Sequence, residues 1–212
     1  MQTQEIAKKI SKHLKSDDGR LMRTKDSRHK IVSAFLSLVR QGNVSPSAED
    51  VAKEAKVGLR TVFRRFNEME LLYREVATEV QATFAPEVAK PWASSIWQEQ
   101  MAERLERKAY FYEKLMPYSI AAKYLRQHSK YLTEFNRRWL DIEHEILESV
   151  LPFNQEEEPE LFNGLEVSLS MDTWIQYRKN QNLSPEKTYQ TMKVILASLI
   201  HAYEAKSKDE VD

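Results

Sequence analysis

The 212-residue chain contains no cysteine, so it can form neither disulfides nor metal sites built from thiolates. It has only four glycines, and no apolar run comes near the ~18 residues of a membrane-spanning helix. Its first residues, MQTQEIAKKI, lack the apolar core of a signal peptide, so we expect a cytoplasmic protein with no membrane partner. A Gly-rich phosphate loop, a nucleophile elbow and an HExxH pair are missing too. We therefore expect no enzyme activity, no cofactor and no metal.

Helix-forming residues at helical spacing dominate what is present. Ile31, Ala34, Phe35 and Leu38 fall at i, i+3, i+4 and i+7 on one helical face, and Gly42 stands where that helix should end. The later pattern predicts helices over 94–115, from Pro117 to about 127, from Ser129 onward, over 160–179, and from Pro185 with Ser184 as its N-cap. The sequence therefore predicts an all-α fold.

Two short helices are predicted between residues 47 and 66. Ser47 is a good N-cap for the first, with Asp50 three residues on. Small Ala52 and Ala55 on its inward face let a neighbouring helix approach closely. A tight turn at 56–58 leads into the second helix, LRTVFRRF. This order is typical of a helix-turn-helix, whose last helix lies in the DNA major groove.

The charge distribution is asymmetric although the net charge is zero. Residues 1–67 carry 15 Lys and Arg against 7 Asp and Glu, or +8, and the other 145 residues carry 17 against 25, or −8. A basic amino-terminal third indicates a polyanionic partner. The alternative is chance variation of charge along the chain.

The second short helix has two unlike faces. On a 3.6-residue period Val62 and Phe66 point inward, whereas Arg60, Thr61 and Arg64 turn toward solvent. A guanidinium fork can read guanine, worth ~1–3 kcal/mol of discrimination, or clamp phosphates. The alternative is a solvated arginine face on an ordinary bundle helix.

The stretch SAEDVAKEAKVGLRTVFRRFNEMELLYREV, within residues 28–76, resembles the amino-terminal domain of the tetracycline-repressor (TetR) family of bacterial transcription regulators. Three positions depart from the family pattern: Lys56 replaces a turn glycine, Phe63 replaces a tyrosine, and Met69 replaces a lysine. The resemblance implies DNA contacts at these positions: Ser47, Lys56, Leu59, Arg60, Thr61, Phe63 and Arg64.

The expected architecture has three parts. A basic arm covers 1–25 and a three-helix helix-turn-helix domain covers 26–68. A long helix links this domain to a larger helical domain over 69–212, which the resemblance assigns to ligand binding and dimerisation.

A homodimer is expected because one short helix reads too few base pairs, whereas two on a dyad, ~34–36 Å apart, read a palindrome. The 160–179 segment is apolar on more than one side, so more than one neighbour should cover it. The resemblance implies a four-helix bundle made from the last two helices of each subunit. The alternative cover is the same chain's core.

The resemblance also implies a small-molecule effector bound among the middle helices, where aromatic residues abound. The many aromatic side chains favour an apolar or aromatic ligand. The candidate residues that contact it are Trp97, Met101, Tyr112, Trp139 and Trp174. Asp141, His144 and Glu148 share a helix face and could bind a metal, but a solvated charged face is the simpler interpretation.

The sequence thus predicts a ligand-responsive dimeric DNA-binding transcription regulator. We expect a repressor that a small molecule releases from a palindromic double-stranded DNA operator. The alternative is a helical protein–protein interaction module whose helix-turn-helix binds a protein partner.

Overall fold

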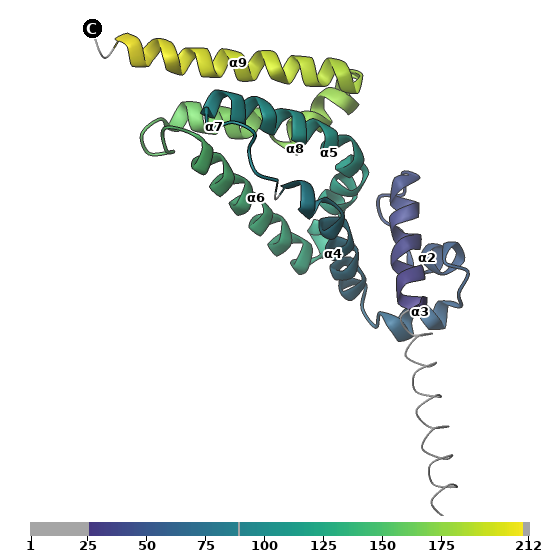
Figure 1. Cartoon of the computed structure of the whole chain (residues 1–212). Coiled ribbons are helices and arrows are strands. Elements are labelled where there is room, and N and C mark those ends of the chain that lie inside the picture. The colour runs from purple at the N-terminus through teal and green to yellow at the C-terminus, as the bar shows by residue number, and fades with distance from the viewer. Residues whose placement is uncertain (1–25, 89, 210–212) are drawn as a thin grey trace, which may run out of the picture. The chain divides into compact units, whose positions relative to one another are not determined.

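A computed structural model describes residues 26–88 and 90–209, and every regular element in these ranges is a helix (Figure 1). The all-α prediction is confirmed. The chain divides into two compact units, Met1–Glu79 (unit 1) and Val80–Asp212 (unit 2). The division falls within α4 (Met69–Val88), whereas the sequence placed it after residue 68. The expected basic arm over 1–25 lies outside the described residues.

Unit 1 is built from a helix over residues 26–40, α2 (Ala48–Glu54), α3 (Leu59–Arg65) and the first part of α4. Gly42 ends the first helix as predicted, at φ +96°. The Gly42 N–H donates to Val39 O at 3.0 Å and the Asn43 N–H donates to Leu38 O at 3.0 Å. These two bonds form a Schellman motif, which needs a left-handed residue. The core comes from all of these helices and includes Ile31, Phe35, Val39, Val51, Ala52, Val62, Phe66 and Leu72.

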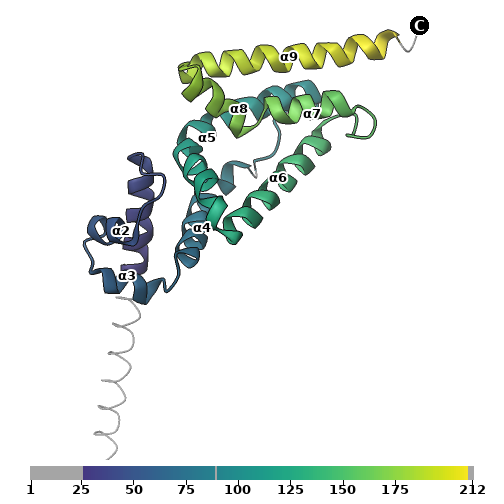
Figure 2. The ribbon, with the colours of Figure 1, turned by 180° about the vertical axis from the view of Figure 1, so that it is seen from behind.

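Unit 2 contains the longer helices. They are α5 (Trp97–Leu125), α6 (Lys130–Val150), α7 (Pro159–Ser168), α8 (Met171–Ile175) and α9 (Pro185–Asp209), with a 3-10 turn at Arg126–His128 and a π-helical turn at Gln176–Asn180. In both ribbon views α9 runs alongside α7 and α5 (Figures 1 and 2). One buried hydrophobic cluster joins α5, α7, α8 and α9 with the end of α6.

Two predicted helix starts in unit 2 are confirmed. The Ser129 hydroxyl accepts the Leu132 N–H at 3.0 Å, and α6 begins at the next residue. The Ser184 hydroxyl accepts the Lys187 N–H at 3.2 Å, and Pro185 opens α9. Such side-chain caps satisfy the first N–H groups of a helix, which have no partner within the helix.

The prediction that Pro117 opens a new helix is wrong, because Pro117 lies inside the continuous α5. A proline removes one backbone donor from a helix and usually kinks or ends it. Here Met116 before it and Ala121 and Leu125 after it are all buried. Burial on both sides of the proline stabilises one helix through the site.

The helix predicted over 160–179 is also interrupted, since α7 ends at Ser168 and α8 begins at Met171. The Leu169 carbonyl accepts the Tyr112 hydroxyl of α5 at 2.7 Å. The Ser170 hydroxyl accepts the Thr173 N–H at 3.1 Å and caps α8. A contact from a helix 57 residues away therefore helps to set this break.

Candidate functional site

The segment α2–turn–α3 begins with the predicted cap. The Ser47 hydroxyl accepts the Asp50 N–H at 3.1 Å, and the Ser47 N–H donates to Asp50 Oδ2 at 3.0 Å, which completes a capping box. The Ser47 hydroxyl also lies 2.9 Å from Asp50 Oδ2, to which it donates. The N–H of Ser47, followed by its hydroxyl, lowers the pKa of Asp50. The Ser47 side chain is thus engaged within the chain.

The turn between α2 and α3 places Lys56 in the left-handed region, at φ 54°. The Val57 N–H donates to Ala52 O at 3.0 Å and the Lys56 N–H donates to Lys53 O at 3.2 Å. This is the same motif that Gly42 makes, built on a residue with a side chain. The exposed Lys56 side chain stands at the start of the turn.

The inward face of α3 is fixed to the rest of unit 1. Val62 and Phe66 are each 1 % exposed, as their spacing predicted. The Arg28 guanidinium lies 4.6 Å from the Phe66 ring centroid, donates to Arg65 O at 3.0 Å and pairs with Glu75 of α4. Arg28 therefore ties the end of α3 to two other helices.

The outward face of α3 carries the predicted contact residues. Arg60, Phe63 and Arg64 are exposed, and Phe63 has 49 % of its surface accessible. Leu59 is at the margin of exposure and Thr61 is half-buried. Within residues 26–88 and 90–209, neither Arg60 nor Arg64 forms an ion pair or a hydrogen bond through its guanidinium.

Arg65, the third arginine of α3, has a different role. Its Nε donates to Ser27 Oγ at 2.8 Å, and its side chain is half-buried. The three arginines of this helix thus divide into one structural residue and two that meet solvent. Arg28, which holds the same end of α3, was not singled out in the sequence because its partners lie 37 and 47 residues away.

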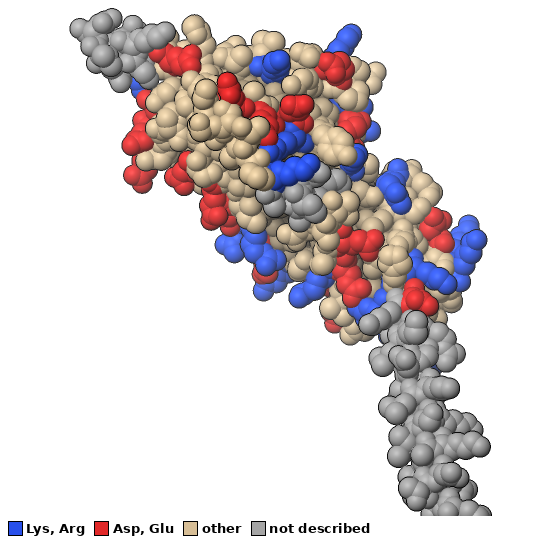
Figure 3. Space-filling view, viewed as in Figure 1, with Lys and Arg blue, Asp and Glu red and all other residues tan. Residues whose placement is uncertain are grey.

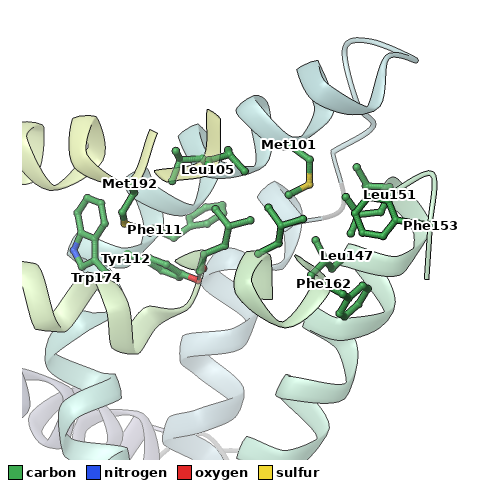
Figure 4. Close-up of a cluster of buried hydrophobic side chains, with 14 of the residues drawn as sticks. Met101, Leu105, Phe111, Tyr112, Leu147, Leu151, Phe153, Phe162, Trp174 and Met192 are labelled. Carbon is green, nitrogen blue, oxygen red and sulfur yellow. Dashed lines mark hydrogen bonds between the residues drawn. The ribbon is translucent and has the colours of Figure 1, made fainter. Parts of the chain in front are cut away.

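Three of the five effector candidates, Met101, Tyr112 and Trp174, lie in the buried hydrophobic cluster of unit 2 (Figure 4), and Trp97 packs against that cluster. Met101 and Trp174 are completely buried, and the Tyr112 and Trp174 rings meet edge-to-face with centroids 6.0 Å apart. Trp97, which is half-buried, packs edge-on against Phe153 with centroids 6.4 Å apart. Trp139 is half-buried on α6 and does not belong to this cluster.

A largely buried polar group, which we call the Arg104 cluster, shares Tyr112 with the hydrophobic cluster; it consists of Arg104, Lys108, Tyr112 and Glu143. Arg104 Nη2 donates to Glu143 Oε2 at 2.8 Å and to the Glu143 carbonyl at 2.9 Å. Lys108 pairs with the same Oε2 and donates to the Tyr112 hydroxyl at 2.9 Å. The sequence did not single out this group, although Arg104 and Lys108 share a helical stripe with Met101.

The ionisation of the Arg104 cluster reflects its burial. Burial lowers the pKa of Lys108 to about 8, against the opposing pull of Glu143. Burial also raises the pKa of the Tyr112 hydroxyl well above its ordinary value. Burial tends to raise the pKa of Glu143, but Lys108 and Arg104 together hold it below its ordinary value. Glu143 is therefore ionised at neutral pH, where Lys108 is mostly protonated.

Asp141, His144 and Glu148 do not form a metal site. In the described part of the chain, no three His, Asp or Glu side chains are arranged to hold an ion. His144 Nδ1 lies 3.1 Å from Glu166 Oε1, and its ring packs 4.9 Å from that of Phe162. Asp141 and Glu148 are exposed.

Among the described residues, no helix combines the length and apolar character needed to cross a membrane. Comparisons of the chain with protein-family models, with curated proteins and with solved structures found no match. The functional argument therefore rests on the residues and geometry given above.

Proposed function

We propose that the protein is a dimeric DNA-binding transcription regulator, a repressor that a small molecule releases from a palindromic operator. In this proposal α2, the turn and α3 form a helix-turn-helix, and unit 2 carries the dimer and effector surfaces. The two-sided character of α3 carries the proposal: Val62 and Phe66 are buried, whereas Arg60 and Arg64 meet solvent. A helix anchored from behind and cationic in front suits docking into a major groove.

The charges of unit 1 support a nucleic-acid partner. Arg60 and Arg64 have no carboxylate partner among the described residues, so both forks are available for guanine edges or phosphates. Figure 3 shows basic and acidic side chains interspersed on the face that it draws, with no single uninterrupted basic patch there. We therefore expect a few specific arginine contacts to matter more than a broad field.

The turn contributes a phosphate contact in this proposal. Lys56 takes the place of a small turn residue and holds an ammonium group beside α3. The Ser47 hydroxyl donates to Asp50, so we assign Ser47 the positioning of α2. The proposed DNA contacts are then Lys56, Leu59, Arg60, Thr61, Phe63 and Arg64.

The dimer is proposed to form through the outward faces of α7 and α9. Leu165, Leu169 and Trp174 are buried in the chain's own core, so the same-chain cover accounts for that side of the segment. Val167 on α7 and Val194 on α9 stay 63 % and 66 % exposed. A second copy of the chain is the partner that would cover them. We expect Val194→Glu to convert a sedimenting dimer into a monomer at micromolar concentration.

DNA binding is tested by selecting bound duplexes from a random-sequence library and aligning those recovered. A two-fold symmetric site with half-sites one helical turn apart is the expected result. Affinity should fall with salt with a log–log slope of ~−0.9 per phosphate neutralised. Arg60→Ala should relax one base position in the selected site, whereas Lys56→Ala should weaken all sequences alike.

Arg40→Ala is the matched control, since Arg40 is exposed in unit 1 but lies outside α2, the turn and α3. It should leave the selected site unchanged. If Arg60→Ala and Arg64→Ala both bind every duplex as the parent does, the assignment of α3 is wrong.

The exposed apolar surface of α3 favours one alternative, a protein partner. Leu59 and Phe63 both face solvent beside the arginines, and apolar residues of this kind also anchor protein interfaces. Binding of an isolated protein partner with little salt dependence, and no selected DNA site, would favour this alternative.

A further inference from the structure

Arg104 and Lys108 are buried cations on α5 that the proposed DNA-binding surface does not use. Arg104 is 5 % exposed, and Lys108 is also buried. Both lie on the stripe of α5 that carries Met101 and Leu105 of the hydrophobic cluster. Buried charged side chains are uncommon, and their partners show what the site is built to hold.

The hydrogen bonds of Arg104 are incomplete. A guanidinium group carries N–H donors on Nε, Nη1 and Nη2. Nη2 donates twice, to the carbonyl and to Oε2 of Glu143. Nε and Nη1 are fully buried and have no acceptor among the described residues. Burying a donor without an acceptor is costly, most of all on a charged group, so an acceptor is expected at this position.

The charges of the Arg104 cluster do not balance either. Arg104 and Lys108 both pair with one oxygen, Oε2, of Glu143. Glu166 also acts on Lys108, but it lies against His144 at 3.1 Å and is partly exposed. Two cations thus share one close carboxylate. A water molecule could accept from Arg104 without compensating the excess positive charge, whereas an anion does both.

We infer that Arg104, with Lys108 beside it, binds the carboxylate of a small organic acid whose apolar body packs among the hydrophobic residues of α5. One negative charge matches the excess of the cluster, which a doubly charged phosphate would exceed. The apolar residues that adjoin the two cations, Met101 and Leu105, suit a hydrocarbon or aromatic body. The binding concerns unit 2 alone, and only its effect on DNA rests on the proposed function.

Isothermal calorimetry on the full chain without DNA tests the inference. The probes are benzoate, hexanoate and octanoate, each paired with its neutral amide, which has the same shape. We expect the best carboxylate to bind at least about ten-fold more tightly than its amide, equivalent to ~1.4 kcal/mol. Arg104→Gln should remove this preference, whereas Arg138→Gln, exposed on α6, should retain it.

A second readout uses the unaltered protein, in case Arg104→Gln does not fold. The pKa of Lys108 is about 8, and an anion placed beside it should raise that pKa. At pH 8 carboxylate binding should therefore take up protons, seen as a heat that depends on the ionisation enthalpy of the buffer. Amide binding should show no such uptake.

The inference is overturned if no carboxylate binds more tightly than its amide, or if a folded Arg104→Gln protein keeps the full preference. Proton release or no proton exchange on carboxylate binding at pH 8 also counts against it. A carboxylate that binds through Arg104 without lowering DNA affinity supports the site and overturns its effector role. Failure to bind any DNA overturns the proposed function, and calorimetry still judges the carboxylate site separately.

Discussion

Phe63 is exposed on α3, whereas Phe66, the residue at which this helix ends, is buried, so truncating each to alanine tests the orientation of α3. Phe66 is 1 % exposed and Phe63 is 49 % exposed. The two substitutions delete the same atoms three residues apart. Phe66→Ala should lower the stability of unit 1, whereas Phe63→Ala should keep that stability and lose affinity for DNA.

The expected magnitudes follow from burial. Removing a fully buried phenyl group costs about 3–5 kcal/mol. Within that sum, the contact of the Phe66 ring with the Arg28 guanidinium contributes about 0.5–1 kcal/mol. Phe63→Ala should stay within about 0.5 kcal/mol of the parent, because surface substitutions are usually neutral. The higher helix propensity of alanine also offsets part of the lost contact of Phe63.

Amide hydrogen exchange is the appropriate assay, since it reports on unit 1 separately. All four tryptophans, Trp92, Trp97, Trp139 and Trp174, lie in unit 2, so tryptophan fluorescence would follow that unit instead. Phe66→Ala should lower protection across residues 31–66 by about 100-fold or more, since each ~1.4 kcal/mol is a factor of ten. Phe63→Ala should keep the protection of the parent and lose affinity for the selected DNA.

Phe66→Leu, which keeps part of the buried volume, should fall between Phe66→Ala and the parent. Equal losses of protection for Phe63→Ala and Phe66→Ala would refute the reasoning, because the solvent-facing side of α3 would then be covered in solution. Unchanged DNA affinity in Phe63→Ala would remove this residue from the proposed contacts.

Three further predictions concern stability. Lys56→Gly should stabilise unit 1 by up to about 1 kcal/mol, because it relieves a left-handed residue at φ 54°, although glycine also adds chain entropy to the unfolded state. Slower amide hydrogen exchange in α2 is expected, and faster exchange would contradict the prediction. Gly164→Ala should raise the free energy of unfolding in urea by about 0.5–1 kcal/mol, because this position lies within α7 and the added Cβ would meet Leu199 Cδ2 at 3.7 Å, an ordinary contact. A lower free energy of unfolding would show that α7 and α9 pack more tightly. The Arg178 guanidinium lowers the pKa of Glu113 below 4.5, so this carboxylate stabilises the fold above pH 4.5 and its contribution is lost as the pH falls through its folded pKa. The stability difference from Glu113→Gln, followed by the tryptophan fluorescence of unit 2, should shrink between pH 6 and pH 3, and a constant difference would refute this role.

Local sequence determined the parts of the fold that depend on near neighbours. The scarcity of glycine and the helical spacing of apolar residues predicted helices, because both act within a few residues of chain. Gly42, the Ser47–Asp50 box and Pro185 marked helix ends correctly for the same reason. The inward face of α3 was also readable, since Val62 and Phe66 are one turn apart.

Contacts between residues far apart in the chain decided what the sequence could not show. Pro117 stays inside α5 because the residues on both sides of it are buried by other helices, and the break at Leu169 depends on the Tyr112 hydroxyl. Arg104 reads as a surface residue until α6 brings Glu143 to it across 39 positions. Local spacing sets which face a side chain occupies. Only the packing of another helix against that face decides whether its charge meets water or is buried with a partner, because desolvation depends on neighbours that the local chain does not supply.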